Sequence, residues 1–137
     1  MTKTHMPTSK AKTAYGLLTE IAALAIAEPK RIAMSTWRQT ASSGVMVLTH
    51  TVFPNAPRAV TMPACGTVGC IGGWFQTLSG RSPYEVIGDT LQEELCYPHA
   101  LCCAAKQQTA AHARAVVAHI RRFQKKYRAF LLATKVR

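Results

Sequence analysis

Hydrophobic side chains recur at helical spacing in two long segments, one toward each end of the chain. The first segment, residues 10–27, places on one face of a helix the apolar residues Ala14, Leu17, Leu18, Ile21, Leu24 and Ala25. Pro29 follows shortly after and disfavours helical geometry in the residue before it. The pattern therefore predicts an amphipathic helix over residues 10–27.

The second segment, about 109–134, is the longest amphipathic pattern in the chain. Thr109 is a good capping residue, and after it apolar positions repeat at i, i+3 and i+4. These positions are Ala113, Val116, Val117, Ile120, Phe123, Tyr127, Phe130 and Leu131. We expect this final helix to dock its apolar stripe on the core.

Shorter helices are predicted between these two. Thr67 can cap a helix over about 67–79, which ends before a glycine. Ser82 precedes a proline and lies three residues before a glutamate, a capping-box pattern that predicts a helix over about 82–95. A proline then interrupts the chain, and residues 99–108 can form one more short helix.

Only one segment has the character of a strand. Residues 45–53 are rich in β-branched side chains and are bounded by Gly44 and Pro54. We therefore expect a mainly α fold, a compact single domain of about four to five helices over residues 10–137. It has at most a small strand or hairpin element around 45–53, and residues 1–9 form a flexible basic tail.

Composition narrows the class of protein. Of the 137 residues, 48% are hydrophobic, which is enough for one core and too many for a disordered chain. No apolar run reaches the roughly 18 residues that cross a bilayer, and no signal-peptide pattern follows the N-terminus. We expect a cytoplasmic protein without a membrane span, in the host bacterial cytoplasm if a phage encodes it.

The charge is strongly positive and unevenly distributed. Seventeen Lys and Arg residues oppose six acidic ones, for a net charge of +11, and no acidic residue follows Glu94. The candidate partner-binding residues are the cations after it: Lys106, Arg114, Arg121, Arg122, Lys125, Lys126, Arg128, Lys135 and Arg137. Because solvated helix faces usually mix both signs, this one predicts a partner, nucleic acid or an acidic host protein surface. Simple solubility and binding to an anionic membrane surface are the alternatives.

A cysteine- and glycine-rich stretch lies at the centre of the chain. It carries the structural motif residues Cys65, Gly66, Thr67, Gly69, Cys70, Gly72, Gly73 and Trp74. No lysine follows in the pattern of a phosphate-binding loop. The favoured interpretation is packing, in which small residues on one helix let neighbouring backbones approach closely and Trp74 closes over them.

Two chemical alternatives stay open for the cysteines. Cys65 and Cys70 are five residues apart, about 140° around a helix, so they could share a zinc ion only if Cys65 lies outside the helix. Cys96, His99, Cys102 and Cys103 could supply the other ligands. Cys65 ahead of a helix could instead be an activated thiol, although no histidine and acid are placed beside it by sequence. We assign no catalytic residue, no metal ligand and no cofactor.

Three segments together resemble a group of small phage, prophage and bacterial proteins. The group carries a C-G-T-x-x-C-[IL]-[AG]-G-[WH] motif between a P-x-R-x-x-M-x-x-W segment and an L-F-Y-P-like one. The matching residues are Pro29, Arg31, Met34, Trp37, Cys65, Gly66, Thr67, Cys70, Gly72, Gly73, Trp74, Leu95, Tyr97 and Pro98. The resemblance covers about half of the chain and implies a helical fold but no chemistry. Cys96 replaces a phenylalanine of the group, which favours a buried apolar role for it.

These patterns predict a non-enzymatic binding protein of phage or mobile-element type. It would engage nucleic acid or an acidic host protein through its cationic C-terminal helix, and an inhibitor of a host defence or nucleic-acid machine is one form of this function. The alternative is a thiol- or metal-dependent protein centred on Cys65, Cys70 and the Cys96–Cys103 cluster.

Overall fold

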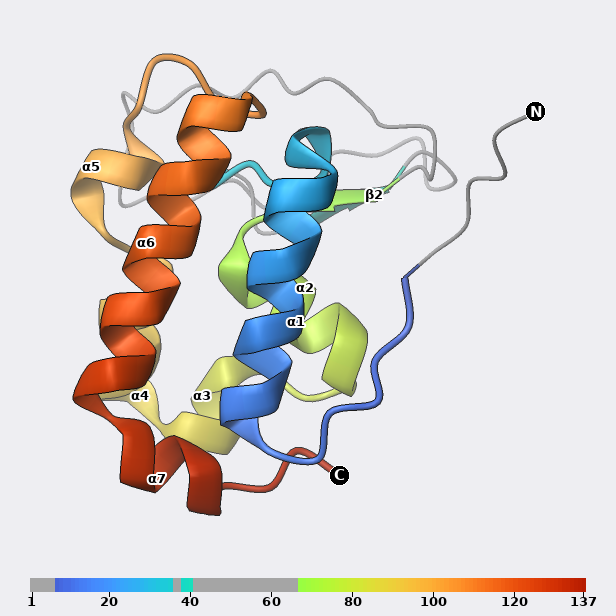
Figure 1. Ribbon diagram of the computed structural model, residues 1–137, viewed down its shortest axis with the longest axis vertical. Coiled ribbons are helices and arrows are strands. Elements are labelled where there is room, and N and C mark those ends of the chain that lie inside the picture. The colour runs from blue at the N-terminus through green and yellow to red at the C-terminus, as the bar shows by residue number, and fades with distance from the viewer. Residues whose placement is uncertain (1–6, 36–37, 41–66) are drawn as a thin grey trace.

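The computed structural model describes residues 7–35, 38–40 and 67–137, and within them the chain is mainly α-helical (Figure 1). This confirms the predicted fold class. The described elements are α1 (Ala14–Ala27), a 3-10 turn η1 (Pro29–Arg31), β1 (Arg38–Thr40), β2 (Thr67–Gly69), α2 (Ile71–Ser79), α3 (Pro83–Ile87), α4 (Asp89–Cys96), α5 (His99–Cys102), α6 (Ala110–Lys126) and α7 (Arg128–Ala133). The predicted strand at 45–53 and the first six residues of the predicted tail lie outside the described residues.

Helices α1 and α6 run antiparallel side by side and make the most extensive helix–helix contact (Figure 1). Thr13 caps α1, because its side chain accepts a hydrogen bond from the Gly16 N–H at 3.1 Å. Helix α1 therefore begins four residues later than the predicted start at residue 10. The α1 stripe packs against α6 and α2, and both Leu17 and Leu18 are fully buried.

The predicted helix over 67–79 is wrong in its first turn. Residues 67–69 form β2, which pairs antiparallel with β1. The Gly69 carbonyl also accepts a hydrogen bond from the Ala33 N–H at 3.0 Å. Because these backbone groups are used by the sheet, they cannot begin a helix. Thr67 is thus not a cap, and α2 begins after Cys70, whose Sγ accepts a hydrogen bond from the Gly73 N–H at 3.4 Å.

The glycines accordingly have different roles from those expected. Gly69 lies in β2, and Gly72 and Gly73 lie in the first turn of α2 rather than along one helix face. Trp74 is buried, as packing predicts, and its Nε1–H donates to the Arg31 carbonyl at 2.6 Å. The motif therefore joins β2, η1 and the start of α2.

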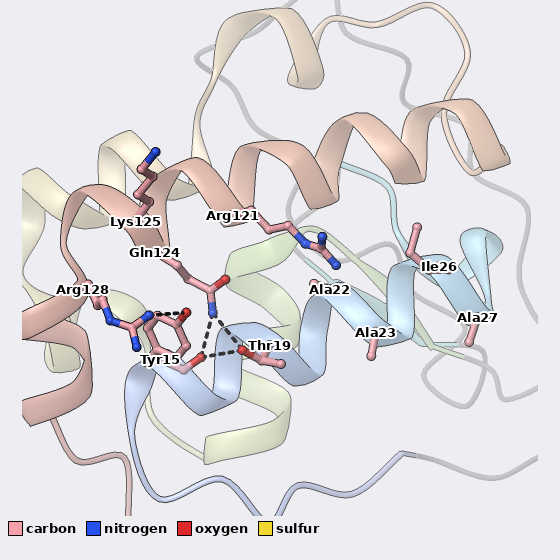
Figure 2. Close-up of a pocket in the computed structure, with 10 residues that line it drawn as sticks. All are labelled: Tyr15, Thr19, Ala22, Ala23, Ile26, Ala27, Arg121, Gln124, Lys125 and Arg128. Atoms are coloured by element: carbon pink, nitrogen blue, oxygen red, sulfur yellow. Dashed lines mark hydrogen bonds between the residues drawn. The ribbon is translucent and has the colours of Figure 1, made fainter.

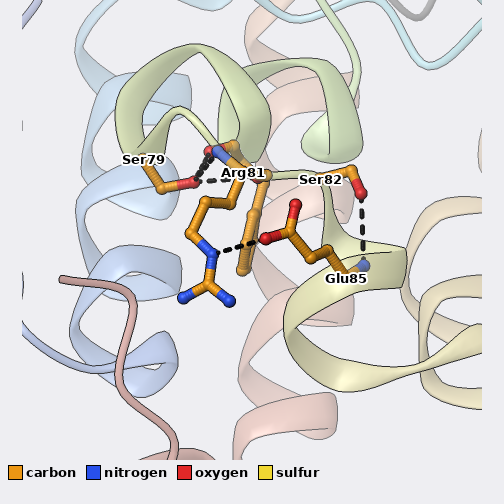
Figure 3. Close-up of polar contacts among 5 residues, drawn as sticks. Ser79, Arg81, Ser82 and Glu85 are labelled. Atoms are coloured by element: carbon orange, nitrogen blue, oxygen red, sulfur yellow. Dashed lines mark hydrogen bonds and ion pairs between the residues drawn. The ribbon is translucent and has the colours of Figure 1, made fainter.

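The junction between α2 and α3 follows the predicted capping signals (Figure 3). Gly80 ends α2 in the left-handed conformation, with φ of 78°. Ser82 caps α3 by accepting a hydrogen bond from the Glu85 N–H at 3.2 Å, and Arg81 pairs with the Glu85 carboxylate at 2.9 Å (Figure 3). Ser79 adds hydrogen bonds to both sides of the turn.

Two predicted helices are interrupted. The one over 82–95 divides into α3 and α4 at Gly88, whose φ of 87° favours glycine. The final helix divides at Tyr127 into α6 and α7, although no glycine or proline marks that position. After this break Phe130 leaves the buried stripe and is 45% exposed, whereas Leu131 stays fully buried.

The end of the chain returns to the start of α1 (Figure 1). The Ala14 N–H donates to the Thr134 carbonyl at 2.8 Å, and the Val136 N–H donates to the Lys12 carbonyl at 2.9 Å. Val136 is buried in the same core as both long helices. None of the helices in the described residues combines the length and apolar character needed to cross a membrane.

Candidate functional site

Helix α6 separates its apolar and cationic residues as the sequence predicts. Thr109 caps the helix by accepting a hydrogen bond from the His112 N–H at 3.1 Å. The residues that face the core include Ala113, Val116, Ile120 and Phe123, which are all buried. The predicted cations of α6 and α7 are all exposed: Arg114, Arg121, Arg122, Lys125, Lys126 and Arg128.

Only one of these six cations has an acidic partner. All six acidic residues of the chain lie in its described part, and Lys126 pairs with Glu94 at 3.2 Å. The other ion pairs in the described part join Arg31 to Glu28 and Arg81 to Glu85. Five cations, which we call the cationic face, are therefore left without a carboxylate: Arg114, Arg121, Arg122, Lys125 and Arg128.

Glu94 is committed to structure rather than to binding. The Tyr127 hydroxyl donates a hydrogen bond to one carboxylate oxygen, and Lys126 donates to the other. The first contact is the main reason why the pKa of Glu94 lies below its ordinary value, with Lys126 adding to it. This pair ties the break between α6 and α7 to α4.

The remaining predicted partner-binding residues lie apart from the cationic face or are occupied. Lys106 is exposed on the loop before α6, and Lys135 is exposed after α7. Arg137 donates hydrogen bonds to the carbonyl groups of Ala11 at 2.6 Å and Leu78 at 2.7 Å. Its guanidinium therefore joins the two ends of the described chain to α2.

A groove of about 700 Å³ runs between α1 and α6 beside the cationic face (Figure 2). We call it the α1–α6 groove. It is lined by Tyr15, Thr19, Ala22, Ala23, Ile26, Ala27, Arg121, Gln124, Lys125 and Arg128. Most of its surface is apolar, and no acidic residue lines it.

Gln124 fixes the distance between the two helices at the base of the groove. Its Nε2 donates to the Tyr15 carbonyl and to Thr19 Oγ1, both at 2.9 Å (Figure 2). Because both partners accept, the amide nitrogen must face α1 and the carbonyl oxygen faces away from them. Arg128 covers the Tyr15 ring, 5.3 Å from its centroid, and donates to its hydroxyl at 3.1 Å.

Sequence reasoning missed the α1 side of this site. Ala23, Ile26 and Ala27 lie outside the buried stripe of α1, and Ile26 is 53% exposed. An isoleucine off the core face was the one available signal, since a solvated position usually carries a polar residue. The pairing of α1 with α6, which forms the groove, could not be read from the sequence.

The cysteine motif is divided by the structure. Cys65 and Gly66 lie outside the described residues, so the thiol at Cys65 is not placed. Cys70, Cys96 and Cys102 are buried, which confirms the apolar role expected for Cys96. Burial raises the pKa of Cys70 and of Cys102 to about 12, and raises that of Cys96 well above its ordinary value. These three side chains are therefore neutral thiols at physiological pH, which disfavours nucleophilic chemistry.

The second group of residues that the zinc alternative would need is also spread out. Cys103 Sγ and His99 Nε2 lie 3.6 Å apart near the surface, whereas Cys96 and Cys102 face the core. Across the described ranges, no three His, Cys, Asp or Glu side chains are grouped so that they could hold a metal ion.

Comparisons of the chain with protein-family models, with curated proteins and with solved structures found no match.

Proposed function

We propose that this protein is a non-enzymatic binding protein whose cationic face engages a negatively charged macromolecule. The observation that carries the proposal is the charge arrangement on α6 and α7. Five exposed cations lie there without a carboxylate partner, whereas the acidic residues are all elsewhere.

The like charges of this face repel one another, which costs free energy unless an anionic partner is bound. Arg121 and Lys125 are four residues apart, as are Arg122 and Lys126, and like charges at this spacing repel. An anionic partner would remove this repulsion and would release counterions from its own surface. The same cations would also accelerate association with such a partner.

Nucleic acid and an acidic host protein both fit this charge. The chain has no recognisable base-reading motif, so contacts to nucleic acid would be mainly to phosphates. The resemblance of the cysteine motif to phage and prophage proteins supports a mobile-element origin and action in a bacterial cytoplasm. An inhibitor that docks on a host defence or nucleic-acid machine is the form of the function that unites these features.

Binding to a 20-base-pair DNA duplex and to polyglutamate, measured against salt concentration, tests the proposal. We expect affinity for at least one of these polyanions to fall steeply between 50 and 200 mM salt, by roughly tenfold or more. The variant Arg121→Glu/Arg122→Glu/Lys125→Glu should abolish that binding and still melt cooperatively.

The matched control is Lys10→Glu/Lys12→Glu/Lys30→Glu. These three lysines are exposed, lie outside α6 and α7, and give the same change in net charge. We expect this variant to retain most of the binding. Equal losses of affinity in the two variants, or an affinity that does not change with salt concentration, would contradict specific binding by the cationic face.

A further inference from the structure

The α1–α6 groove combines two surfaces of different chemistry. Its α1 side carries the exposed side chains of Ala23, Ile26 and Ala27, and its opposite edge carries Arg121 and Lys125 (Figure 2). A phosphate backbone would be bound by the cations alone and would gain nothing from the apolar side. A ligand that also has apolar side chains would use both.

The apolar side is large enough to contribute to binding. Ile26 is 53% exposed, and the alanines beside it leave room above the helix, so the groove opens to about 700 Å³. Burying apolar surface favours binding in proportion to the area removed from water. An aliphatic side chain of a partner that covered Ile26 would therefore add affinity that polyanion binding lacks.

The cationic edge selects the charge of the ligand. Arg121 extends from α6 toward α1, whereas Lys125, one turn further along α6, lines the groove with its amino group directed away from α1 (Figure 2). Neither has a carboxylate partner within the described structure, and no acidic side chain lines the groove. Arg128 is engaged with Tyr15, so these two residues are the cations available to a ligand.

The length of the α1 side of the groove suits a short helix. Its α1 residues extend from Tyr15 to Ala27, about 18 Å at the rise of an α-helix, which matches three turns of a partner helix. A helix satisfies its own backbone hydrogen bonds and can place apolar residues at i, i+3 and i+4 along such a groove. Carboxylates on the adjoining positions would then meet Arg121 and Lys125.

We infer that the α1–α6 groove is a docking site for an acidic amphipathic helix of a partner protein. The inference rests on the proposed function and narrows it, because it selects protein rather than nucleic acid as the ligand. Apolar residues of the partner helix would cover Ile26 and the neighbouring alanines, and its acidic residues would pair with Arg121 and Lys125.

A designed peptide provides the test. The probe is a labelled, stapled 14-residue helical peptide with leucines at i, i+3 and i+4, three glutamates beside them and alanines elsewhere, and its matched control replaces each leucine with glutamine. We expect the leucine peptide to bind about tenfold more tightly than the glutamine peptide, because only it can bury apolar surface.

Three variants locate the binding. Arg121→Glu should weaken binding of the leucine peptide about tenfold, and Ile26→Gln about fivefold. Arg114→Glu makes the same charge change on the same helix outside the groove and should weaken it less than about twofold. Because all three positions are exposed, each variant should still unfold in one cooperative thermal transition.

Each other outcome is informative. Equal binding of the two peptides, or equal losses of peptide affinity for Arg121→Glu and Arg114→Glu, would contradict a docking site in the groove. The proposed binding by the cationic face would still stand. Binding of a DNA duplex alone, unaffected by Ile26→Gln, would likewise exclude the helix and retain the proposed function. Failure of peptides, polyglutamate and DNA to bind would overturn both.

Discussion

Cys70 connects three parts of the fold through one residue. Its Sγ accepts the hydrogen bond from the Gly73 N–H that caps α2, and its carbonyl accepts one from the Trp74 N–H at 3.0 Å. Trp74 in turn donates to the Arg31 carbonyl. A small residue is required at position 70 because its side chain is fully buried, and an acceptor is required because a helix begins there.

This capping role predicts the order of two substitutions. Cys70→Ala should lower the free energy of unfolding by about 1–3 kcal/mol, because it leaves the buried Gly73 N–H without its acceptor. Cys70→Ser should cost less, since a hydroxyl oxygen is the better capping acceptor. Urea denaturation of the two variants beside the unaltered protein measures both values.

The opposite order would identify a different role for the sulfur. If Cys70 only filled space within a helix, as the sequence suggests, serine would be worse than alanine because its hydroxyl would be buried without a partner. A serine variant less stable than the alanine variant would therefore contradict the cap.

At the scale of elements, most local signals in the sequence were reliable, with Thr67 the exception, and non-local contacts left no signal. Ser82 and Thr109 mark the starts of α3 and α6, because a cap depends on hydrogen bonds within four residues. Strand β2 was missed since its pairing partner β1 lies 27 residues earlier, and Thr67 has the chemistry of a cap as well. The break at Tyr127 involves a contact with Glu94, 33 residues away, which no periodicity reveals.

The candidate site could likewise be predicted only where it depends on a single segment of the sequence. The cations of α6 could be predicted, because charge and helical spacing are properties of one segment. The apolar side of the groove could not be predicted, because Ile26 becomes part of a groove only when α1 packs beside α6 through Gln124.

Two histidines make the docking of α6 sensitive to pH. His112 Nε2 lies 3.1 Å from the Leu101 carbonyl, and His119 Nε2 lies 3.0 Å from the Leu95 carbonyl. Since a carbonyl only accepts, each Nε2 carries the proton and each ring is neutral when Nδ1 is not protonated. Burial lowers the pKa of both residues, and the positive charge of Arg122 lowers that of His119 further.

We therefore predict that the protein loses stability as the pH falls below about 6.5, the ordinary pKa of histidine. Above that pH both residues are neutral in either state. Below it the unfolded chain binds protons that the folded chain does not, so the free energy of unfolding falls by up to about 1.4 kcal/mol per pH unit for each histidine. Urea denaturation at pH 8, 7, 6 and 5 measures this slope.

Substitution identifies the source of the slope. His112→Gln and His119→Gln should each reduce it, and the double variant His112→Gln/His119→Gln should reduce it most. The hydrogen bond from the Tyr127 hydroxyl holds the pKa of Glu94 below its ordinary value, so this carboxylate is not the expected source of the slope. A slope that persists in the double variant would show that other groups titrate instead.

At the scale of the whole molecule, positive charge opposes the packing that holds the helices together. The core joins both long helices to the C-terminal segment, and Arg137 ties that segment to α2. The net charge of +11 acts against this closure, and three ion pairs in the described residues offset little of it. The repulsion is concentrated on α6, where four members of the cationic face lie on one helix.

This imbalance predicts that salt stabilises the free protein. Raising the ionic strength from about 0.01 M to 0.15 M shortens the Debye length from about 30 Å to about 8 Å, which screens cations one to three turns apart on α6. The exposed Lys126–Glu94 pair would weaken as well, but such a pair contributes at most about 1 kcal/mol. We expect the melting temperature at pH 7.5 to rise across this range. Arg121→Gln/Lys125→Gln should reduce the rise more than Lys12→Gln/Lys30→Gln, which removes the same charge elsewhere. A melting temperature that fell with salt would show that attraction outweighs repulsion, and the cationic face would then need no anionic partner to relieve it.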